Sequence, residues 1–441
     1  MPITIFADEA APINTNLIMT LTKHSIDLTN ITKLLPKHAW CFGHIDKLNR
    51  WVIIVLTLIV LSACNQTDQS PIHKEASFSK THSKTGSPYG TKAVFSYPEF
   101  AGKFKVASHS IVLSDQSRIE RFTPDSVENR KLQIRFYYPT NAPANNTNEQ
   151  KKLPIIAQDA WDYLVGPNQI KGKMLRFDNY HNAKWDITLD AEVDTYQPSY
   201  PVLIFSHGYG FSAESYSALS AEIASQGYIV VSINHTYGAN PSDFGSDNLV
   251  WAQPLQSDSI GAYLPIWSDD QLFVIEQLSL INSNPDSLFF NRLDLANLGV
   301  FGHSYGGAAS YYSASRDPRI KAVIDIDGTI FDFEDRYIEQ PFAFILSKDH
   351  KPKFDFDLAG NDAYKIRFQQ FEHVSFTDHV LWWQWDHDEL DLGLGKVDAY
   401  RAIELTSKIT TQFFDHYLVN RNNGLLAEQS LSAEEIEITY Y

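Results

Sequence analysis

The sequence predicts an α/β fold, in which one mostly parallel β-sheet carries helices on both of its faces. Two continuous apolar runs, residues 201–206 and 228–234, are typical of parallel strands that are buried on both faces. A stretch with helical spacing separates them, and strands continue to alternate with helices toward the C-terminus. This alternation indicates a single parallel-sheet domain rather than several domains of about 150 residues each.

The individual elements follow in order along the chain. Residues 103–112 and 131–139 alternate apolar and polar side chains, which predicts two antiparallel strands. Residues 141–198 lack a clear pattern, and we interpret them as an insertion. After the insertion we expect strand 201–206, helix 215–225, strand 228–234, helix 268–281, strand 298–301 with a helix behind it, strands 320–326 and 341–346, and helix 399–418.

Composition excludes several classes of protein. Hydrophobic residues make up 44% and aromatic residues 13% of the chain, enough for a sizeable core, so the chain as a whole is not disordered. With 36 Lys and Arg against 53 Asp and Glu, the net charge of −17 repels phosphate backbones, and we expect no nucleic-acid partner. Two cysteines, Cys41 and Cys64, are too few for a disulfide-rich scaffold or a paired-cysteine metal site.

The N-terminal region predicts export and a lipid anchor. Lys47 and Arg50 precede an apolar run over 51–61, which is shorter than the roughly 20 residues a membrane span needs and is typical of a secretory signal. The motif Leu-Ser-Ala-Cys that ends at Cys64 resembles the bacterial lipobox, which implies a lipidated cysteine as first mature residue. Asn65 after it implies the outer membrane of the bacterial cell envelope.

We therefore expect three parts: a signal region over 1–63, a lipid-anchored flexible linker over 64–90 and a folded catalytic domain over 91–441. The linker is rich in Ser, Thr, Gln, Lys and His and has few apolar residues. Residues 1–46 exceed a usual signal n-region, so we expect translation to start further downstream. The alternatives are an ordinary signal peptide or a buried helix in which Cys64 is incidental.

A Gly-x-Ser-x-Gly motif occupies residues 302–306, with Ser304 at its centre. An apolar strand ends at Phe301, and a helix of small residues begins at Gly307. This strand–turn–helix context is the one in which α/β-hydrolases expose a nucleophilic serine, and amides at the helix N-terminus favour a developing negative charge. The motif predicts Ser304 as the nucleophile of an α/β-hydrolase fold; the alternative is a glycine turn with a capping serine.

A serine nucleophile needs a base and an orienting carboxylate, which follow in the order acid, then histidine, in this fold. Asp327 lies at the C-terminal tip of the 320–326 strand, where sites form in open α/β sheets. Asp325 lies inside the strand, and we interpret it as a buried structural partner. His373 and His379 share one downstream loop, and sequence spacing does not choose between them.

The turn His207-Gly208-Tyr209-Gly210 follows the first buried strand and resembles the His-Gly turns of esterases. Such a turn supplies a backbone N–H to the oxyanion hole. We interpret His207, like His303, as a residue that shapes a turn and not as a base.

A competing pattern is Asp325-Ile-Asp-Gly-Thr329, which resembles the aspartyl nucleophile signature of haloacid-dehalogenase-type phosphatases with Mg²⁺. It leaves Ser304 unexplained, and no acidic pair on a later strand end completes a magnesium site. The acidic, Trp-rich run 382–391 lacks the ligand spacing of a calcium loop, and we interpret it as a solvated loop at the mouth of the site. We expect no metal and no cofactor.

Several separated motifs together resemble the plasma-type platelet-activating factor acetylhydrolases, the lipoprotein-associated phospholipase family. The resemblance runs from about residue 131 to 418 and rests on segments in the family's order: 132–139, 200–210, 223–229, 302–307, the strand tip at Asp327, 340–342, 373–378 and 402–408. The chain departs from the family in the small residues after Asp327 and in the Trp-rich segment after His373.

The resemblance implies a catalytic triad of Ser304 as nucleophile, Asp327 as acid and His373, rather than His379, as base. It implies an oxyanion hole made by the backbone N–H groups of Tyr209 and Tyr305. The implied substrates are phospholipids with short or oxidised sn-2 acyl groups. The alternatives are a general carboxylesterase or polyester hydrolase, and a lipoprotein that uses the fold to bind without catalysis.

Overall fold

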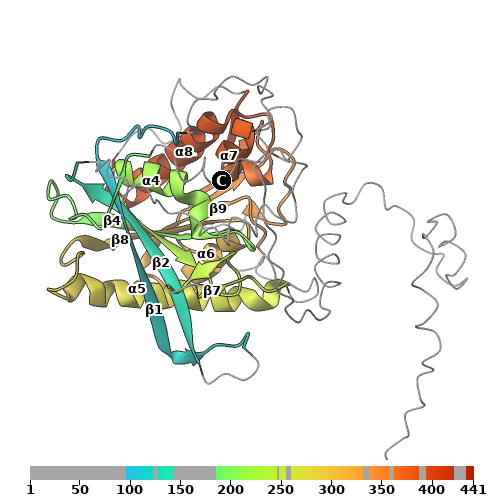
Figure 1. Cartoon of the computed structure of the whole chain (residues 1–441). Coiled ribbons are helices and arrows are strands. Elements are labelled where there is room, and N and C mark those ends of the chain that lie inside the picture. The colour runs from blue at the N-terminus through green and yellow to red at the C-terminus, as the bar shows by residue number, and fades with distance from the viewer. Residues whose placement is uncertain are drawn as a thin grey trace, which may run out of the picture. The chain divides into compact units, whose positions relative to one another are not determined.

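The computed structural model describes residues 96–123, 128–143, 185–245, 248–254, 260–330, 338–356, 362–386, 394–421 and 434–441. Within these ranges ten strands form one sheet (Figure 1). From edge to edge they are β12 (Ile436–Tyr440), β11 (Ala363–Phe368), β10 (Phe342–Leu346), β9 (Ile320–Ile326), β8 (Leu293–His303), β4 (Tyr200–Ser206), β5 (Ile229–Asn234), β2 (Asn129–Thr140), β1 (Lys105–Ile119) and β3 (Ile187–Leu189).

The centre of the sheet is parallel, and its flanks are mixed. Neighbouring strands from β11 to β5 all run parallel, whereas β2 pairs antiparallel with both β5 and β1, and β12 pairs antiparallel with β11. Every residue of β4 and of β5 is buried, as their continuous apolar runs predict. The predicted α/β fold with a mostly parallel sheet is confirmed.

Helices cover both faces of the sheet (Figure 1). One buried cluster joins side chains of α4 (Ser217–Ser225), α7 (His379–Asp386) and α8 (Ala399–Val419) to one face. A second cluster joins α5 (Leu264–Ser283) and α6 (Tyr305–Ala314) to the opposite face. Successive side chains of one strand point to opposite faces of the sheet: in β4, Leu203 packs with the first cluster and Ile204 with the second.

Three predicted details need correction. The Trp-rich run that we interpreted as a solvated loop begins as helix α7, and its Trp382 is only 3% exposed and donates its indole N–H to the Tyr97 hydroxyl. Strand β3 lies in the segment interpreted as an insertion and pairs parallel with β1. Strands β11 and β12, which form one edge of the sheet, were not expected from the sequence at all.

The predicted signal region, Cys64 and the linker over 64–90 lie outside the described residues. Among the helices that the structure does describe, none combines the length and the apolar character needed to cross a membrane.

Candidate active site

Ser304 sits on a sharp turn between a strand and a helix. Strand β8 ends at His303 and α6 begins at Tyr305, and Ser304 between them has φ 55° and ψ −120°. Residues other than glycine rarely adopt this backbone conformation, which costs on the order of 1–3 kcal/mol. A Cβ on Gly306 would lie 2.2 Å from the Ser206 carbonyl oxygen, so the motif requires glycine there. The turn thus places Ser304 at the C-terminal edge of the sheet.

The three residues of the expected triad lie in hydrogen-bond contact. The Ser304 hydroxyl donates to His373 Nε2 across 3.0 Å, and His373 Nδ1–H donates to Asp327 Oδ2 across 2.7 Å. These distances are those of a nucleophile, a base and an orienting carboxylate. The arrangement can therefore deprotonate the hydroxyl and stabilise the imidazolium that results.

Asp327 directly follows β9 and is 1% exposed. Its Oδ1 accepts the Ser347 N–H at 2.6 Å, and His350 Nδ1 lies 3.8 Å from the same oxygen. Burial raises the pKa of the carboxyl, but the hydrogen bond and charge of His373, together with His350 and the Ser347 N–H, outweigh it and lower the pKa to about 2. Asp327 is therefore ionised at neutral pH.

His373 occupies a short 3₁₀ turn, His373–Phe376, whose N-terminal end is capped by reciprocal bonds between Glu372 and Ser375. Its side chain remains 44% exposed, which leaves the imidazole open to solvent and substrate. His379 does not join the site: it is 7% exposed and packs against Phe211 and Trp382, with ring centroids at 5.2 and 4.7 Å.

Tyr209 and Tyr305 flank the turn that carries Ser304. Their rings meet edge to face at 5.7 Å, and both rings contact Trp267 of α5. The Tyr305 N–H belongs to the first turn of α6, where the helix dipole favours negative charge. Both expected oxyanion donors thus lie on segments next to Ser304, at the ends of adjacent strands β4 and β8.

Asp325 lies inside β9 and is fully buried, as expected of a structural partner. Its Oδ1 accepts the Gly328 N–H at 2.8 Å, and burial raises the pKa of its carboxyl well above the usual range. In the part of the chain that the structure describes, no group of three or more His, Cys, Asp or Glu side chains could hold a metal ion. Asp325 is held inside the sheet by a backbone contact, which is the structural role expected of it.

Sequence reasoning missed a relay of hydrogen bonds beneath the site. His303 Nε2–H donates to the His373 carbonyl at 3.0 Å, and its Nδ1 accepts the Tyr216 hydroxyl at 2.7 Å. The Tyr216 oxygen also accepts the Gly208 N–H at 3.1 Å. His303 was expected only to shape a turn; it also joins the turn of His373 to the loop of Tyr209. No motif or spacing in the sequence around Tyr216 indicates this contact.

Known proteins resemble the chain over most of its length. A family model described as platelet-activating factor acetylhydrolase, isoform II, matches residues 90–242 and 279–429, more than half of the chain. A probable 1-alkyl-2-acetylglycerophosphocholine esterase of Arthroderma benhamiae is 26% identical over 389 residues, which are 78% of this chain and 93% of the relative. The platelet-activating factor acetylhydrolase of Cavia porcellus is 25% identical over 332 residues, 66% of this chain and 73% of the relative.

A solved structure agrees with the architecture. The ferulic acid esterase from Streptomyces cinnamoneus superposes with a TM-score of 0.63 and 23% sequence identity, over 79% of this chain and 100% of that chain. This likeness establishes the α/β-hydrolase fold and nothing about the substrate. The family match, which covers more than half of the chain, confirms the expected resemblance at the level of the family. The chain belongs to the platelet-activating factor acetylhydrolase isoform II family.

Proposed function

We propose that this chain is a serine esterase that hydrolyses short-chain or oxidised sn-2 acyl esters of phospholipids. The observation that carries the proposal is the pair of contacts made by His373, 3.0 Å to the Ser304 hydroxyl and 2.7 Å to Asp327, in a member of this family. The names of the relatives in Arthroderma benhamiae and Cavia porcellus support an acetyl ester as one substrate.

The reaction proceeds through an acyl-enzyme. Ser304 Oγ attacks the ester carbonyl carbon while His373 Nε2 takes the hydroxyl proton, and Asp327 holds the imidazole tautomer and stabilises the imidazolium. The N–H groups of Tyr209 and Tyr305 bind the oxyanion of the tetrahedral intermediate. The imidazolium then protonates the departing alcohol, and a water molecule, deprotonated by His373, releases the acid.

The test compares the wild-type full chain with a Ser304→Ala variant on p-nitrophenyl esters from acetate to palmitate. We expect cleavage of the short esters and a loss of at least about 10³-fold in the variant. Phosphatidylcholines with sn-2 acetyl or sn-2 palmitoyl then test the acyl-length preference. Equal rates on the two would remove that part of the proposal.

Two further measurements on the same proteins separate the other candidates. Hydrolysis of a polyester film without hydrolysis of phospholipid would favour the polyester hydrolase. An inert wild type whose Ser304 does not react with a fluorophosphonate would favour the non-catalytic binding module. Full activity in Ser304→Ala would exclude Ser304 as nucleophile.

We also propose that Cys64 is lipidated and anchors the enzyme in the bacterial outer membrane. The support is the sequence around Cys64, an apolar run with a basic flank that ends at a lipobox-like motif. Intact mass of the membrane-extracted protein decides the question. A mature N-terminus ahead of Cys64, or an unmodified Cys64, would contradict the anchor.

A further inference from the structure

The peptide group that joins Gly208 to Tyr209 is fixed on its carbonyl side. The Gly208 oxygen accepts His207 Nδ1–H at 2.7 Å and the Phe211 N–H at 3.0 Å. The N–H of the same peptide group belongs to Tyr209 and has no acceptor among the described residues. Because a trans peptide is planar, its C=O and N–H point in opposite directions, and a group that holds the carbonyl also sets the direction of the N–H.

The ring of His207 is restricted to one tautomer. Its Nδ1 must carry a proton to donate to the Gly208 carbonyl, and its Nε2 must be free of a proton to accept the His235 N–H at 3.2 Å. The side chain is fully buried, and burial, reinforced by His235, lowers its pKa to about 3. His207 is therefore a neutral Nδ1–H donor throughout the physiological pH range.

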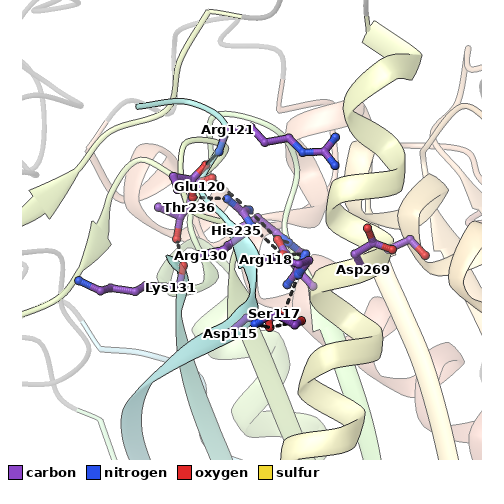
Figure 2. Close-up of polar contacts among 12 residues, drawn as sticks. Asp115, Ser117, Arg118, Glu120, Arg121, Arg130, Lys131, His235, Thr236 and Asp269 are labelled. Atoms are coloured by element: carbon purple, nitrogen blue, oxygen red, sulfur yellow. Dashed lines mark hydrogen bonds and ion pairs between the residues drawn. The ribbon is translucent and has the colours of Figure 1, made fainter. Parts of the chain in front are cut away.

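His235, which supplies this N–H, is held in turn by a buried ionic cluster (Figure 2). Its Nδ1–H donates to Asp270 Oδ2 at 2.9 Å, its Nε2 accepts the Ser206 hydroxyl at 2.9 Å, and its ring stacks on Trp267 at 4.0 Å. Arg130 binds both oxygens of Asp270, at 2.7 and 2.6 Å.

Ser206, His235 and Asp270 repeat the residue types and contacts of a catalytic triad. All three are fully buried, so no substrate can reach them, and this second triad cannot be a second active site. Its position directly below the loop that begins at His207 gives it a supporting role instead.

We propose that His207 is a positioning residue for the oxyanion hole, and that the buried His235–Asp270 pair fixes its ring and tautomer. His207 then aims the Tyr209 N–H at the oxygen that becomes negative. The inference rests on the proposed esterase activity of Ser304. Since the oxyanion exists only in the transition state, an error in the aim of this N–H lowers kcat and leaves KM nearly unchanged.

A matched pair of variants tests the proposal. In His207→Asn, the amide NH₂ can occupy the place of Nδ1–H and donate to the Gly208 carbonyl. In His207→Gln, the longer side chain carries its amide toward the place of Nε2 and leaves that carbonyl without the ring donor. Both are neutral, so charge does not differ between them.

We expect His207→Gln to lower kcat for p-nitrophenyl acetate by about 10- to 100-fold, less than the loss of a whole oxyanion donor, with little change in KM. His207→Asn should recover most of this loss. A trifluoromethyl ketone, which forms a tetrahedral oxyanion with a serine, should lose affinity for the Gln variant by the same factor as kcat/KM.

Thermal unfolding of both variants checks their folding. If His207→Gln does not fold, Ser206→Ala serves in its place, because it keeps His207 and removes the hydroxyl that binds His235 Nε2 and Gln271 Nε2; a smaller loss in kcat is then expected. Equal kcat in the Asn and Gln variants, a loss that appears in KM, or unchanged affinity for the ketone would overturn the proposal. A wild type that is inert and unlabelled at Ser304 by a fluorophosphonate would overturn the proposed function itself, and this inference with it.

Discussion

Asp327 shows how a single buried carboxylate serves the site. It accepts from His373 Nδ1 and from the Ser347 N–H, so it determines which nitrogen of the imidazole carries the proton. We predict that Asp327→Asn lowers kcat by about 10³- to 10⁴-fold, because the amide can favour the imidazole tautomer that cannot accept the Ser304 proton. Steady-state kinetics on p-nitrophenyl acetate measure the effect. A variant within about tenfold of wild type would contradict the role of Asp327 as acid.

At this scale the sequence predicts some side chains and not others. Ser304 and Asp327 can be predicted because each directly follows an apolar strand, and strand ends meet at one edge of a parallel sheet. His373 and His379 cannot be told apart by spacing, because both lie in one loop whose path depends on packing elsewhere. The contact between Arg130 and Asp270 spans 140 positions and carries no local signal.

Helix α4 is connected to the turn of His373 through Asp378. The Asp378 Oδ2 accepts the Ala218 N–H at 2.9 Å in the first turn of α4, and the Asp378 N–H donates to the Ser215 carbonyl at 2.7 Å. Asp378 is fully buried, and burial raises the pKa of its carboxyl to about 8, although bonds from backbone N–H groups partly oppose this. The helix and the turn therefore share one buried acid.

This raised pKa predicts how stability depends on pH. A carboxyl with a higher pKa in the folded state than in the unfolded state binds more protons when folded, so stability falls as pH rises from about 4 to about 8. Asp378→Asn keeps an acceptor oxygen but cannot ionise. We expect its free energy of unfolding, relative to wild type, to increase over this pH range. Urea unfolding at pH 5, 6.5 and 8 measures it, and parallel curves would contradict the prediction.

The elements themselves were predicted as well as their apolar content allowed. Strands β4 and β5 are apolar at nearly every position and were recognised. Strand β11 was missed because Lys365 and Arg367 interrupt its apolar residues, and Arg367 is drawn to the carbonyls of Ser347, Lys348 and His350 in the loop beside Asp327. A strand whose apolar residues are interrupted by charged side chains that bind a neighbouring loop has the sequence pattern of a loop.

For the molecule as a whole, the last strand, β12, forms one edge of the sheet and covers β11. Strand β12 covers β11 from Tyr364 to Phe368, and Tyr441 beyond it stacks on Phe356 at 4.8 Å. An uncovered edge strand pairs readily with other chains. Residues 434–441 thus cover β11, the strand whose Arg367 binds the loop beside Asp327.

We predict that deletion of residues 434–441 destabilises the protein by at least about 2 kcal/mol, because several ladder hydrogen bonds are lost together. The shortened chain should also self-associate through β11. Chemical unfolding and light scattering after gel filtration measure the two effects. A monomer of unchanged stability would show that β12 is dispensable.

The backbone at Ser304 and at Asp327 has φ 55° in both cases, at the ends of neighbouring strands β8 and β9. The backbone conformation that places each catalytic side chain in the site is one that a residue with a Cβ disfavours. The same conformation therefore serves the reaction and lowers the stability of the fold. We predict that the stabilities of two inactive variants reverse their usual order. The free energy of unfolding of Ser304→Gly should be about 1 kcal/mol higher than that of Ser304→Ala, although glycine ordinarily destabilises a fold. Urea unfolding of both variants measures the difference. Equal stability of the alanine and glycine variants would mean that the backbone at Ser304 is not strained.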